Sequence, residues 1–449
     1  MYLLSTRQLL AIAFAALAVC TAGAAAGQES PSNPPPPFIR GDITSPTAEP
    51  AQAYLRGHAA LFAEREDIAI RMFREGCQKQ EPRSCFNVAQ MIVDQLNAQP
   101  APRSPDPSMI VTIIEGYTAA CDLELQLGCT KLIHYLRSPD YGLQDLGRAR
   151  TLAHSACEAK EPEACGELAE IYYRGEGVDV DLPKAAALFY EACHSDGPAS
   201  NCFNYGLMLD KGQVRDETSV GPSYYYWTGC RRGSDEACIN LAVALAGLPE
   251  VPDNLDIASG LLEQVCKRGS RIACTNLAVL TLDHRLGAEP PATAAIFYRK
   301  ACEAGDGAAC RGLGNLAQEG VKQAGAPREA IGLFEKGCEL GSGPSCYNAG
   351  LMHLIGFETA EQPLLGLHWF AKGCTLGSAA SCAGAAMASY VPKPTHPNLG
   401  VDAARRWLGQ ARALNPTDPI VLSLEAWLPD DETDASAPAS PPPPLAPRP

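Results

Sequence analysis

The chain has 449 residues, 46% of them hydrophobic, and its 36 Lys and Arg against 51 Asp and Glu give a net charge of −15 at pH 7. Nucleic acids and anionic membrane surfaces are bound through basic patches, so this balance argues against both as partners. The length allows about two or three ordinary domains or one long repeat array, and the nineteen cysteines favour an oxidising compartment in which they pair.

Residues 1–26 have the pattern of a cleaved secretory signal. Arg7 precedes an apolar run from Leu9 to Val19 that is too short to span a bilayer, and small residues follow from Ala22 to Ala26. We therefore expect a secreted or periplasmic protein without a transmembrane segment. The preceding Leu17-Ala18-Val19 also gives Cys20 some likeness to the lipid-anchored cysteine of a bacterial lipobox. Otherwise Cys20 leaves with the signal, and eighteen of the nineteen cysteines remain, an even number.

Both ends of the mature chain are low in apolar residues. Residues 27–50 are rich in Pro, Ser and Gly, and the four prolines from Pro34 to Pro37 favour an extended, disordered linker. Residues 429–449 are acidic and then rich in Pro and Ala, which predicts a disordered tail. The folded body is expected at 51–428, and it begins with one or two amphipathic helices that end on Cys77.

From Cys77 onward the cysteines fall in nine pairs. Eight pairs are eight residues apart and one is nine apart, and from Cys121 the first members of successive pairs are 36 or 37 residues apart. A fixed period of this length is typical of a helical solenoid. The longer interval before Cys121 contains Pro100, Pro102, Pro105 and Pro107, and predicts a loop inserted between the two helices of the first repeat. The pairs are Cys77 with Cys85, Cys121 with Cys129, Cys157 with Cys165, Cys193 with Cys202, Cys230 with Cys238, Cys266 with Cys274, Cys302 with Cys310, Cys338 with Cys346, and Cys374 with Cys382.

The residues between the two cysteines of a pair predict a helix end followed by a helix start. A Gly stands three residues after the first cysteine in five repeats, and Gly197 stands one position later in another. Such a Gly suits the left-handed position that closes a helix, and the Ser or Asp that follows it suits the N-cap of the next helix. Each C-x7-C therefore spans a turn between antiparallel helices. The glycines are Gly233, Gly269, Gly305, Gly341 and Gly377, and the N-cap candidates are Ser234, Ser270, Asp306, Ser342 and Ser378.

The two helices of a period differ in composition. The helix after the second cysteine is rich in Leu, Ala and Gly, which allows close contact, and the other carries aromatics such as Phe189, Tyr298 and Trp369, expected to form interhelical core. A last period without cysteines has Ala411 at the cysteine position. The apolar segment 420–428 that follows is expected to be a capping helix.

The stretch 165–193 resembles a known family. Leu168, Tyr172, Gly175, Gly177, Val178, Asp181, Lys184 and Ala185 give L-x3-Y-x2-G-x-G-V-x2-D-x2-K-A, which is similar to the Sel1-like repeat, and the paired cysteines resemble the cysteine-rich Sel1 proteins of Helicobacter. The resemblance covers roughly residues 75–415. It implies an all-α fold: an α/α superhelical solenoid of about nine to ten 36-residue repeats, related to TPR arrays and stapled by a disulfide across each hairpin.

The eighteen paired cysteines are therefore expected to be structural. The recurrent local spacing favours a link within each C-x7-C, across which two cysteines can reach a Cα separation of about 5.5–6 Å. A loop of this length is worth about 2.5 kcal/mol in the chain-entropy model. A redox-active role would require a C-x-x-C, and a zinc site would require Cys and His at closer spacing.

Enzyme motifs are lacking in the sequence. It contains no S-x-x-K, H-E-x-x-H, G-x-S-x-G or C-x-x-C-H, and its eight histidines form no i,i+4 pair. We predict no catalytic residue, no metal site and no cofactor. The family resemblance nevertheless implies one alternative, since some cysteine-rich members have been assigned penicillin binding and weak β-lactamase activity.

An asparagine recurs two residues after the second cysteine. In TPR-like arrays this helix lines the concave groove, where a carboxamide can pair with a peptide backbone of any sequence. The alternative is that each Asn bridges to the neighbouring repeat, because Asn within a helix needs a partner. We call these positions the ladder; they hold Asn87, Asn204, Asn240, Asn276 and Asn348, with Lys131, Glu167, Gly312 and Gly384 in the other four places.

The sequence thus predicts a monomeric, non-enzymatic scaffold that binds a peptide or protein on its concave face. The alternative is a binder related to β-lactams or peptidoglycan, or a weak β-lactamase-like hydrolase. A purely structural role in the cell envelope is a third possibility that the sequence does not separate from the first.

Overall fold

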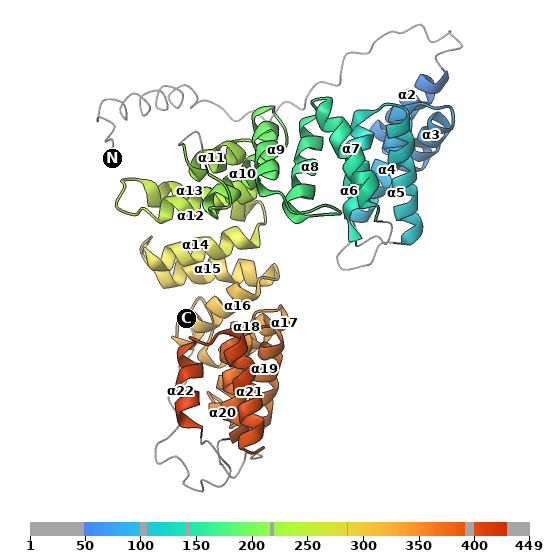
Figure 1. Ribbon diagram of the computed structural model, residues 1–449. Helices are drawn as coiled ribbons and strands as arrows, with labels where there is room; N and C mark the ends of the chain where they lie inside the picture. Colours follow the sequence, from blue (N-terminus) through green and yellow to red (C-terminus); the bar gives the residue numbers. More distant parts are fainter. Residues whose placement is uncertain are drawn as a thin grey trace. The chain divides into compact units, whose positions relative to one another are not determined.

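The computed structural model describes residues 49–98, 106–139, 144–215, 220–284, 286–390 and 399–428. All secondary structure within these ranges is helical (Figure 1), which confirms the predicted all-α class. The predicted signal peptide with Cys20, the tail 429–449 and all but the end of the linker 27–50 lie outside the described residues.

The chain divides into two compact units, residues 1–125 and 126–449. The described part of the first unit contains two antiparallel helix pairs, so the segment that ends on Cys77 forms two helices. The expected loop before Cys121 also falls between helices, although its residues 99–105 are not among those described. The helices are α2 (Glu49–Phe62), α3 (Glu66–Gln78), α4 (Pro82–Asn97) and α5 (Pro107–Asp122).

The second unit continues the pattern of successive antiparallel helices (Figure 1). Helices that carry the second cysteine of a pair are called A helices (α4, α6 and so on to α20), and those that carry the first are called B helices (α3, α5 and so on to α19). The bounds are α6 Gln126–Arg137, α7 Leu146–Glu158, α8 Pro162–Arg174, α9 Leu182–His194, α10 Ala199–Asp210, α11 Pro222–Arg231, α12 Asp235–Ala246, α13 Asn254–Lys267, α14 Arg271–Asp283, α15 Pro290–Glu303, α16 Gly307–Gln318, η3 Pro327–Glu329, α17 Ala330–Glu339, α18 Gly343–Ile355, α19 Pro363–Thr375, α20 Ala379–Tyr390, α21 Val401–Leu414 and α22 Pro419–Trp427.

The turn from each B helix to the next A helix has the geometry that the sequence predicts. The five glycines have φ between 81° and 102°, and Ser234, Ser270, Asp306, Ser342 and Ser378 each accept a hydrogen bond from a first-turn backbone N–H. Four turns reach positive φ without glycine, at Gln80, Glu124, Lys160 and Asp196. In the nine-residue turn, Asp196 takes the left-handed position that we expected for Gly197.

The disulfides pair as predicted, each within its own C-x7-C or C-x8-C. The Cα atoms of the eight links with described geometry lie between 4.5 and 4.8 Å apart, closer than the expected 5.5–6 Å because the turn is tight. Cys121 and Cys129 are disulfide-bonded as well. The eight links join Cys77 to Cys85, Cys157 to Cys165, Cys193 to Cys202, Cys230 to Cys238, Cys266 to Cys274, Cys302 to Cys310, Cys338 to Cys346, and Cys374 to Cys382.

The second cysteines lie deep in the array. Cys165, Cys238 and Cys274 are each at most 5% exposed, and the Sγ atoms of Cys165 and Cys274 lie 3.6 Å from the carbonyl oxygens of their partner cysteines. Each staple therefore holds the last turn of a B helix against the first turn of the following A helix, within the core of the hairpin.

Glycines in the A helices make room for aromatic side chains of the B helices. A Cβ at Gly350 would lie 2.7 Å from the Phe370 ring, and one at Gly314 would lie 2.6 Å from the Phe334 ring. Both rings are fully buried, as is Phe189, which confirms the prediction that these aromatics form interhelical core.

Alternate helices also contact one another, and they do so mainly on the A side. Contacts join α6 to α8, α10 to α12, α12 to α14, α16 to α18 and α18 to α20, whereas among the B helices of this unit the notable contact is between α17 and α19. Within this unit the A helices thus contact one another more than the B helices do, and they carry the ladder positions.

Candidate functional site

The ladder residues share one face of the A helices with the residues three positions later, because side chains at i and i+3 point the same way on a helix. We call this surface of the second unit the ladder face. It is defined by Glu167 and Glu170 on α8, Asn204 and Leu207 on α10, Asn240 and Val243 on α12, and Asn276 and Val279 on α14.

Three ladder asparagines bridge to the preceding A helix or its equivalent. The amide of Asn204 donates to the carboxylate of Glu170 at 2.9 Å, and that of Asn348 donates to the Asn315 side chain at 3.2 Å. In the first unit, Asn87 lies 3.0 Å from Nε2 of His58. Bridging, one of the two predicted alternatives, is therefore observed at these positions. The role of the ladder in ligand binding stays a prediction.

The ladder positions differ in exposure. Asn204, Asn240 and Asn276 are half-buried, whereas Asn348 is completely buried. Asn240 bonds to the Tyr226 phenol. The pKa of that phenol is raised to about 12, chiefly by burial and also by the Asp210 carboxylate, although the bond from Asn240 acts to lower it. Asn240 and Asn276 thus remain accessible, and Asn348 belongs to the core.

At its N-terminal end the ladder face holds a charged depression of about 510 Å³. Its central group is Arg137, at the end of α6, whose side chain is only 12% exposed. The guanidinium donates to Glu176 at 2.6 and 3.1 Å, pairs with Glu167, and lies 3.8 Å from Glu170. Burial lowers the pKa of Arg137, but its hydrogen bond to Glu176 and the charge of Glu167 outweigh this effect and raise it overall.

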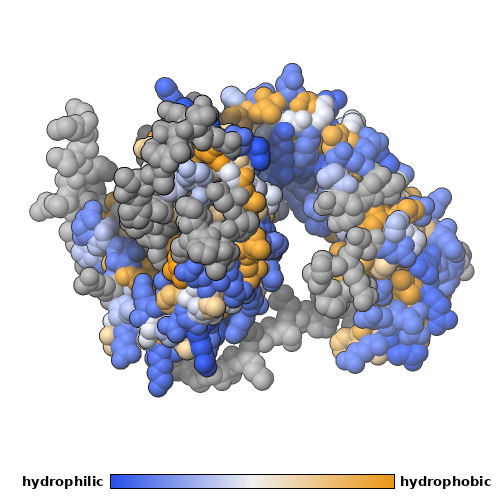
Figure 2. Space-filling model, turned by 90° about the horizontal axis from the view of Figure 1, so that it is seen from below, coloured by the Kyte–Doolittle hydropathy of each residue, from blue (hydrophilic) through white to orange (hydrophobic). Residues whose placement is uncertain are grey.

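Further toward the C-terminus the ladder face becomes apolar. Val243 is 53% exposed and Val279 is 41% exposed, although each stands on a helix whose other face is core. Asn240 and Asn276 lie one helical turn before them. On the face of the molecule in Figure 2, hydrophobic residues form separate patches within a mainly hydrophilic surface. The ladder face therefore offers carboxamides next to exposed aliphatic side chains.

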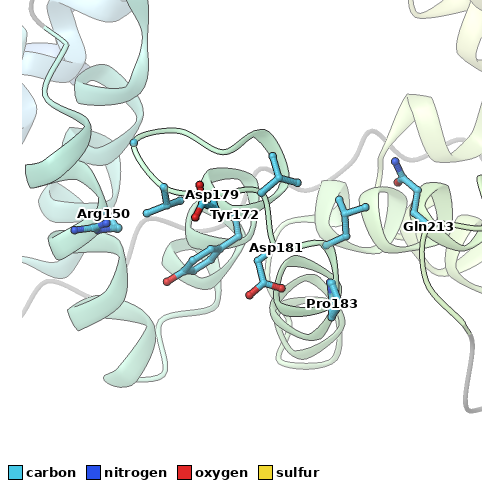
Figure 3. A pocket seen from close by; sticks show the side chains of 10 residues that line it. Arg150, Tyr172, Asp179, Asp181, Pro183 and Gln213 are labelled. Atoms are coloured by element: carbon cyan, nitrogen blue, oxygen red, sulfur yellow. The ribbon is translucent and has the colours of Figure 1, made fainter.

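A second hollow, of about 790 Å³, lies at the glycine-rich turn between α8 and α9 (Figure 3). Two of its polar lining residues, Tyr172 and Asp181, hold the turn. Asp181 caps α9 by accepting from the Lys184 backbone N–H at 3.0 Å, and the Lys184 ammonium donates to the Tyr172 hydroxyl at 2.8 Å while lying 4.0 Å from the ring centre. Gly175 and Gly177 both have positive φ. The motif is therefore explained by local structure.

The described residues contain no group of three or more His, Cys, Asp or Glu that could hold a metal ion. Among the same residues, no helix combines the length and the apolar character needed to cross a membrane.

Comparisons with known proteins place the helical repeat in a family. The family model described as Sel1 repeat matches residues 162–196, 271–306, 307–342 and 343–378. Cytochrome c oxidase assembly factor 7 of Mus musculus is 30% identical over 159 residues, which are 33% of this chain and 68% of that protein. The chain belongs to the Sel1-repeat family.

Other relatives agree with this assignment. Cytochrome c oxidase assembly factor 7 of Homo sapiens is 32% identical over 138 residues, which are 29% of this chain and 59% of the human protein, less than two thirds of its length. A protective antigen of uropathogenic Escherichia coli with an SLR fold superposes with a TM-score of 0.53 at 17% identity, covering 82% of this chain and 83% of the antigen. A Sel1 repeat protein of Oxalobacter formigenes gives 0.50 at 17% identity, covering 75% and 100%. The family supports the coarser functional prediction, a repeat scaffold for protein–protein interaction.

The matched Sel1 repeats also show at which helices each repeat begins and ends. Each runs from an A helix to the next B helix, as 307–342 runs from α16 to α17. The disulfide Cys302–Cys310 thus joins one matched repeat to the next, and Cys338–Cys346 does the same. The staples close helix hairpins as predicted, and these hairpins straddle the boundaries between consecutive Sel1 repeats.

Sequence reasoning missed the charged depression. Arg137 and Glu176 are 39 residues apart, and a scan for enzyme motifs does not pair them. The signal that could have found the cluster is the spacing of Glu163, Glu167 and Glu170, which places three carboxylates on one helix face at i, i+4 and i+7.

Proposed function

We propose that this Sel1-repeat protein is a non-enzymatic scaffold that holds an extended peptide or protein segment along the ladder face. The observation that carries the proposal is the pairing of half-buried Asn240 and Asn276 with exposed Val243 and Val279 on successive A helices. A carboxamide offers both a donor and an acceptor to a peptide backbone, and an exposed valine one turn away offers apolar contact to a side chain.

The proposal is consistent with the name of the relatives. Cytochrome c oxidase assembly factor 7 of human and mouse is named for an assembly process. Assembly requires that other proteins be held, and a row of similar binding positions on a rigid array serves that purpose.

The test is co-purification of partners with the disulfide-intact protein as bait, combined with a peptide array. We expect the triple variant Asn204→Ala, Asn240→Ala, Asn276→Ala and the double variant Val243→Ser, Val279→Ser to lose most of the capture. The matched control is Ile257→Ser, Ile296→Ser, which changes two exposed residues of the B helices α13 and α15. Equal capture by all the proteins would contradict a binding role for the ladder face.

We further propose that the protein works outside the cytoplasm, secreted or in the periplasm. Disulfides persist in oxidising compartments, which supports this location. Mass spectrometry of the mature protein would locate its first residue. A start after Ala24 or Ala26 would support a cleaved signal, a diacylglyceryl group on Cys20 would show a lipoprotein, and an unprocessed N-terminus would contradict export through this signal.

The alternative function, binding or weak hydrolysis of β-lactams, is separable by labelling with a fluorescent penicillin. We expect no stoichiometric adduct, because the sequence contains no S-x-x-K. A stable adduct on the full chain would favour the alternative.

A further inference from the structure

Asn201 stands at the base of the charged depression with an unused hydrogen-bond donor. The residue is 4% exposed, and its Nδ2 atom has no hydrogen-bond partner. Its carboxamide packs against Gly166, and a Cβ at Gly197 would lie 3.2 Å from that Nδ2. A buried donor without a partner costs about 1–3 kcal/mol. The two glycines therefore make room for a side chain whose burial is not compensated by a hydrogen bond of its amide nitrogen within the chain.

The equivalent position in other repeats shows that this asparagine is not required by the fold. The residue just before the second cysteine is Ala in four repeats, at Ala164, Ala237, Ala273 and Ala309. It is Gly at Gly128 and Ser at Ser84, Ser345 and Ser381. The hydroxyls of Ser345 and Ser381 donate to the carbonyl oxygens of Gly307 and Gly343, both at 3.2 Å, whereas the buried Ser84 hydroxyl has no hydrogen-bond partner. Asn201 instead lines the depression.

The start of α10 adds further donors at the same edge. This helix of 12 residues has Pro198 at its N-cap, without a side-chain hydrogen bond to its first turn. Pro198 and the exposed Ser200 border the depression with Asn201. The first backbone N–H groups of a helix favour a carbonyl or an anionic oxygen.

Carboxylates line the other side of the depression. Glu163, Glu167, Glu170 and Glu176 face two lining cations, Arg137 and Arg174, which leaves a negative balance. The Glu163 side chain is 36% exposed and that of Glu170 is 23% exposed, so both can be reached from solvent although each already has a partner, Lys131 and Arg137 or Arg174 respectively. One edge thus donates hydrogen bonds and the other accepts them.

We propose that this depression binds a basic peptide segment. A main-chain carbonyl of the segment accepts from Nδ2 of Asn201, and a Lys or Arg side chain of the same segment pairs with Glu163 and Glu170. The inference deepens the proposed function, on which it rests, by naming the kind of sequence held at this end of the ladder face.

The test measures binding of fluorescein-labelled peptides of equal length, alternating Ala-Lys, Ala-Glu and Ala-Ser, to the disulfide-intact full chain. The Ala-Lys peptide is expected to bind most tightly, and Asn201→Ala to weaken it about fivefold, as expected for one lost hydrogen bond. The thermal midpoint of the free variant should be unchanged or higher, because the unpaired donor is gone. Glu163→Gln should reduce the preference for Ala-Lys over Ala-Ser.

Asn201→Ser provides a second variant, since the array tolerates Ser at this position elsewhere. A lower thermal midpoint with unchanged peptide affinity in both variants would show a packing role and overturn the inference. So would a wild-type protein that binds no peptide of the set or prefers Ala-Glu. The proposed function fails separately, if the Val243→Ser, Val279→Ser variant, which leaves the depression unchanged, captures partners as well as the wild type does.

Discussion

Helices α10 and α18 carry asparagine at the same ladder position but in different surroundings. Asn204 on α10 is half-buried and bonds to the carboxylate of Glu170, whereas Asn348 on α18 is completely buried and bonds to Asn315. Eleven of the 13 residues of α18 are buried, against five of the 12 residues of α10. One recurrent residue therefore lies at an accessible surface in one repeat and in the core in another.

The neighbouring side chains account for this difference. On α18, Gly350 lets the Phe370 ring approach, and Tyr347 and Leu351 complete an apolar cluster shared with α20. On α8 and α10 the corresponding surroundings are charged: they include Glu167 and Glu170, whose side chains are 21% and 23% exposed, and the Arg137 guanidinium that pairs with them. The ladder positions are therefore accessible at α10–α14, whereas Asn348 on α18 belongs to the core.

The largest effect should come from placing a charge at the two asparagines. Asn348→Asp buries a carboxylate beside Asn315, and we expect it to lower the free energy of unfolding by about 3 kcal/mol at pH 7. The loss should shrink as the pH falls toward about 4, where the unfolded carboxyl also takes up a proton. Asn204→Asp, which is half-buried near Glu170, should cost less than about 1 kcal/mol. Urea unfolding measures both losses, and an equal loss of unfolding free energy in the two variants would show that burial does not set the cost.

Removing a staple should have the next largest effect. Replacing Cys338 and Cys346 together by Ala should cost about 2.5 kcal/mol, from the entropy that the nine-residue loop regains in the unfolded chain. Replacing Cys193 and Cys202, whose loop is one residue longer, should cost nearly the same. Thermal unfolding of both double variants, compared with that of the reduced wild type, measures these losses of stability. A much larger loss at Cys338 and Cys346 would show that the buried repeats depend on the bond beyond loop closure.

Two arginines of the charged depression share a carboxylate partner, and we expect them to contribute differently to stability. Arg137 is 12% exposed and Arg174 is 62% exposed, and both lie within ion-pair distance of Glu170. Arg137→Gln leaves Glu167 and Glu176 without their main cation and should cost about 2 kcal/mol. Arg174→Gln, the matched control, should cost no more than about 0.5 kcal/mol. Similar losses in urea unfolding would show that burial does not set the strength of these pairs.

Features that depend on short stretches of chain were predictable from the sequence. The caps at Ser234 and Asp306, the left-handed glycines such as Gly305 and the pairing of each C-x7-C all follow from residues within one turn of the chain, and the structure has all three. Local preferences such as capping and left-handed turns are carried by the residue itself, so a pattern reveals them.

The candidate site was predictable only in part. The ladder spacing placed Asn204 and Asn240 on one surface, but the burial of Asn348 depends on the size of side chains from three helices. The bonds of Arg137 join residues 30 and 39 positions apart. Such contacts depend on how helices pack, and a repeat period alone does not determine them.

The left-handed position after the first cysteine also separates the early repeats from the late ones. It is Gln80 (φ 62°) in the first turn and Gly305 (φ 90°) in a late one. Gly305→Ala should cost about 1 kcal/mol. A Cβ there would meet only Cδ2 of Leu340, at 4.0 Å, but the backbone angle disfavours every L side chain. Gln80→Gly should gain up to about 0.5 kcal/mol, since the relief of strain is partly offset by the added freedom of glycine in the unfolded chain. Urea unfolding measures both, and a stabilising Gly305→Ala would show that late turns keep their form without glycine.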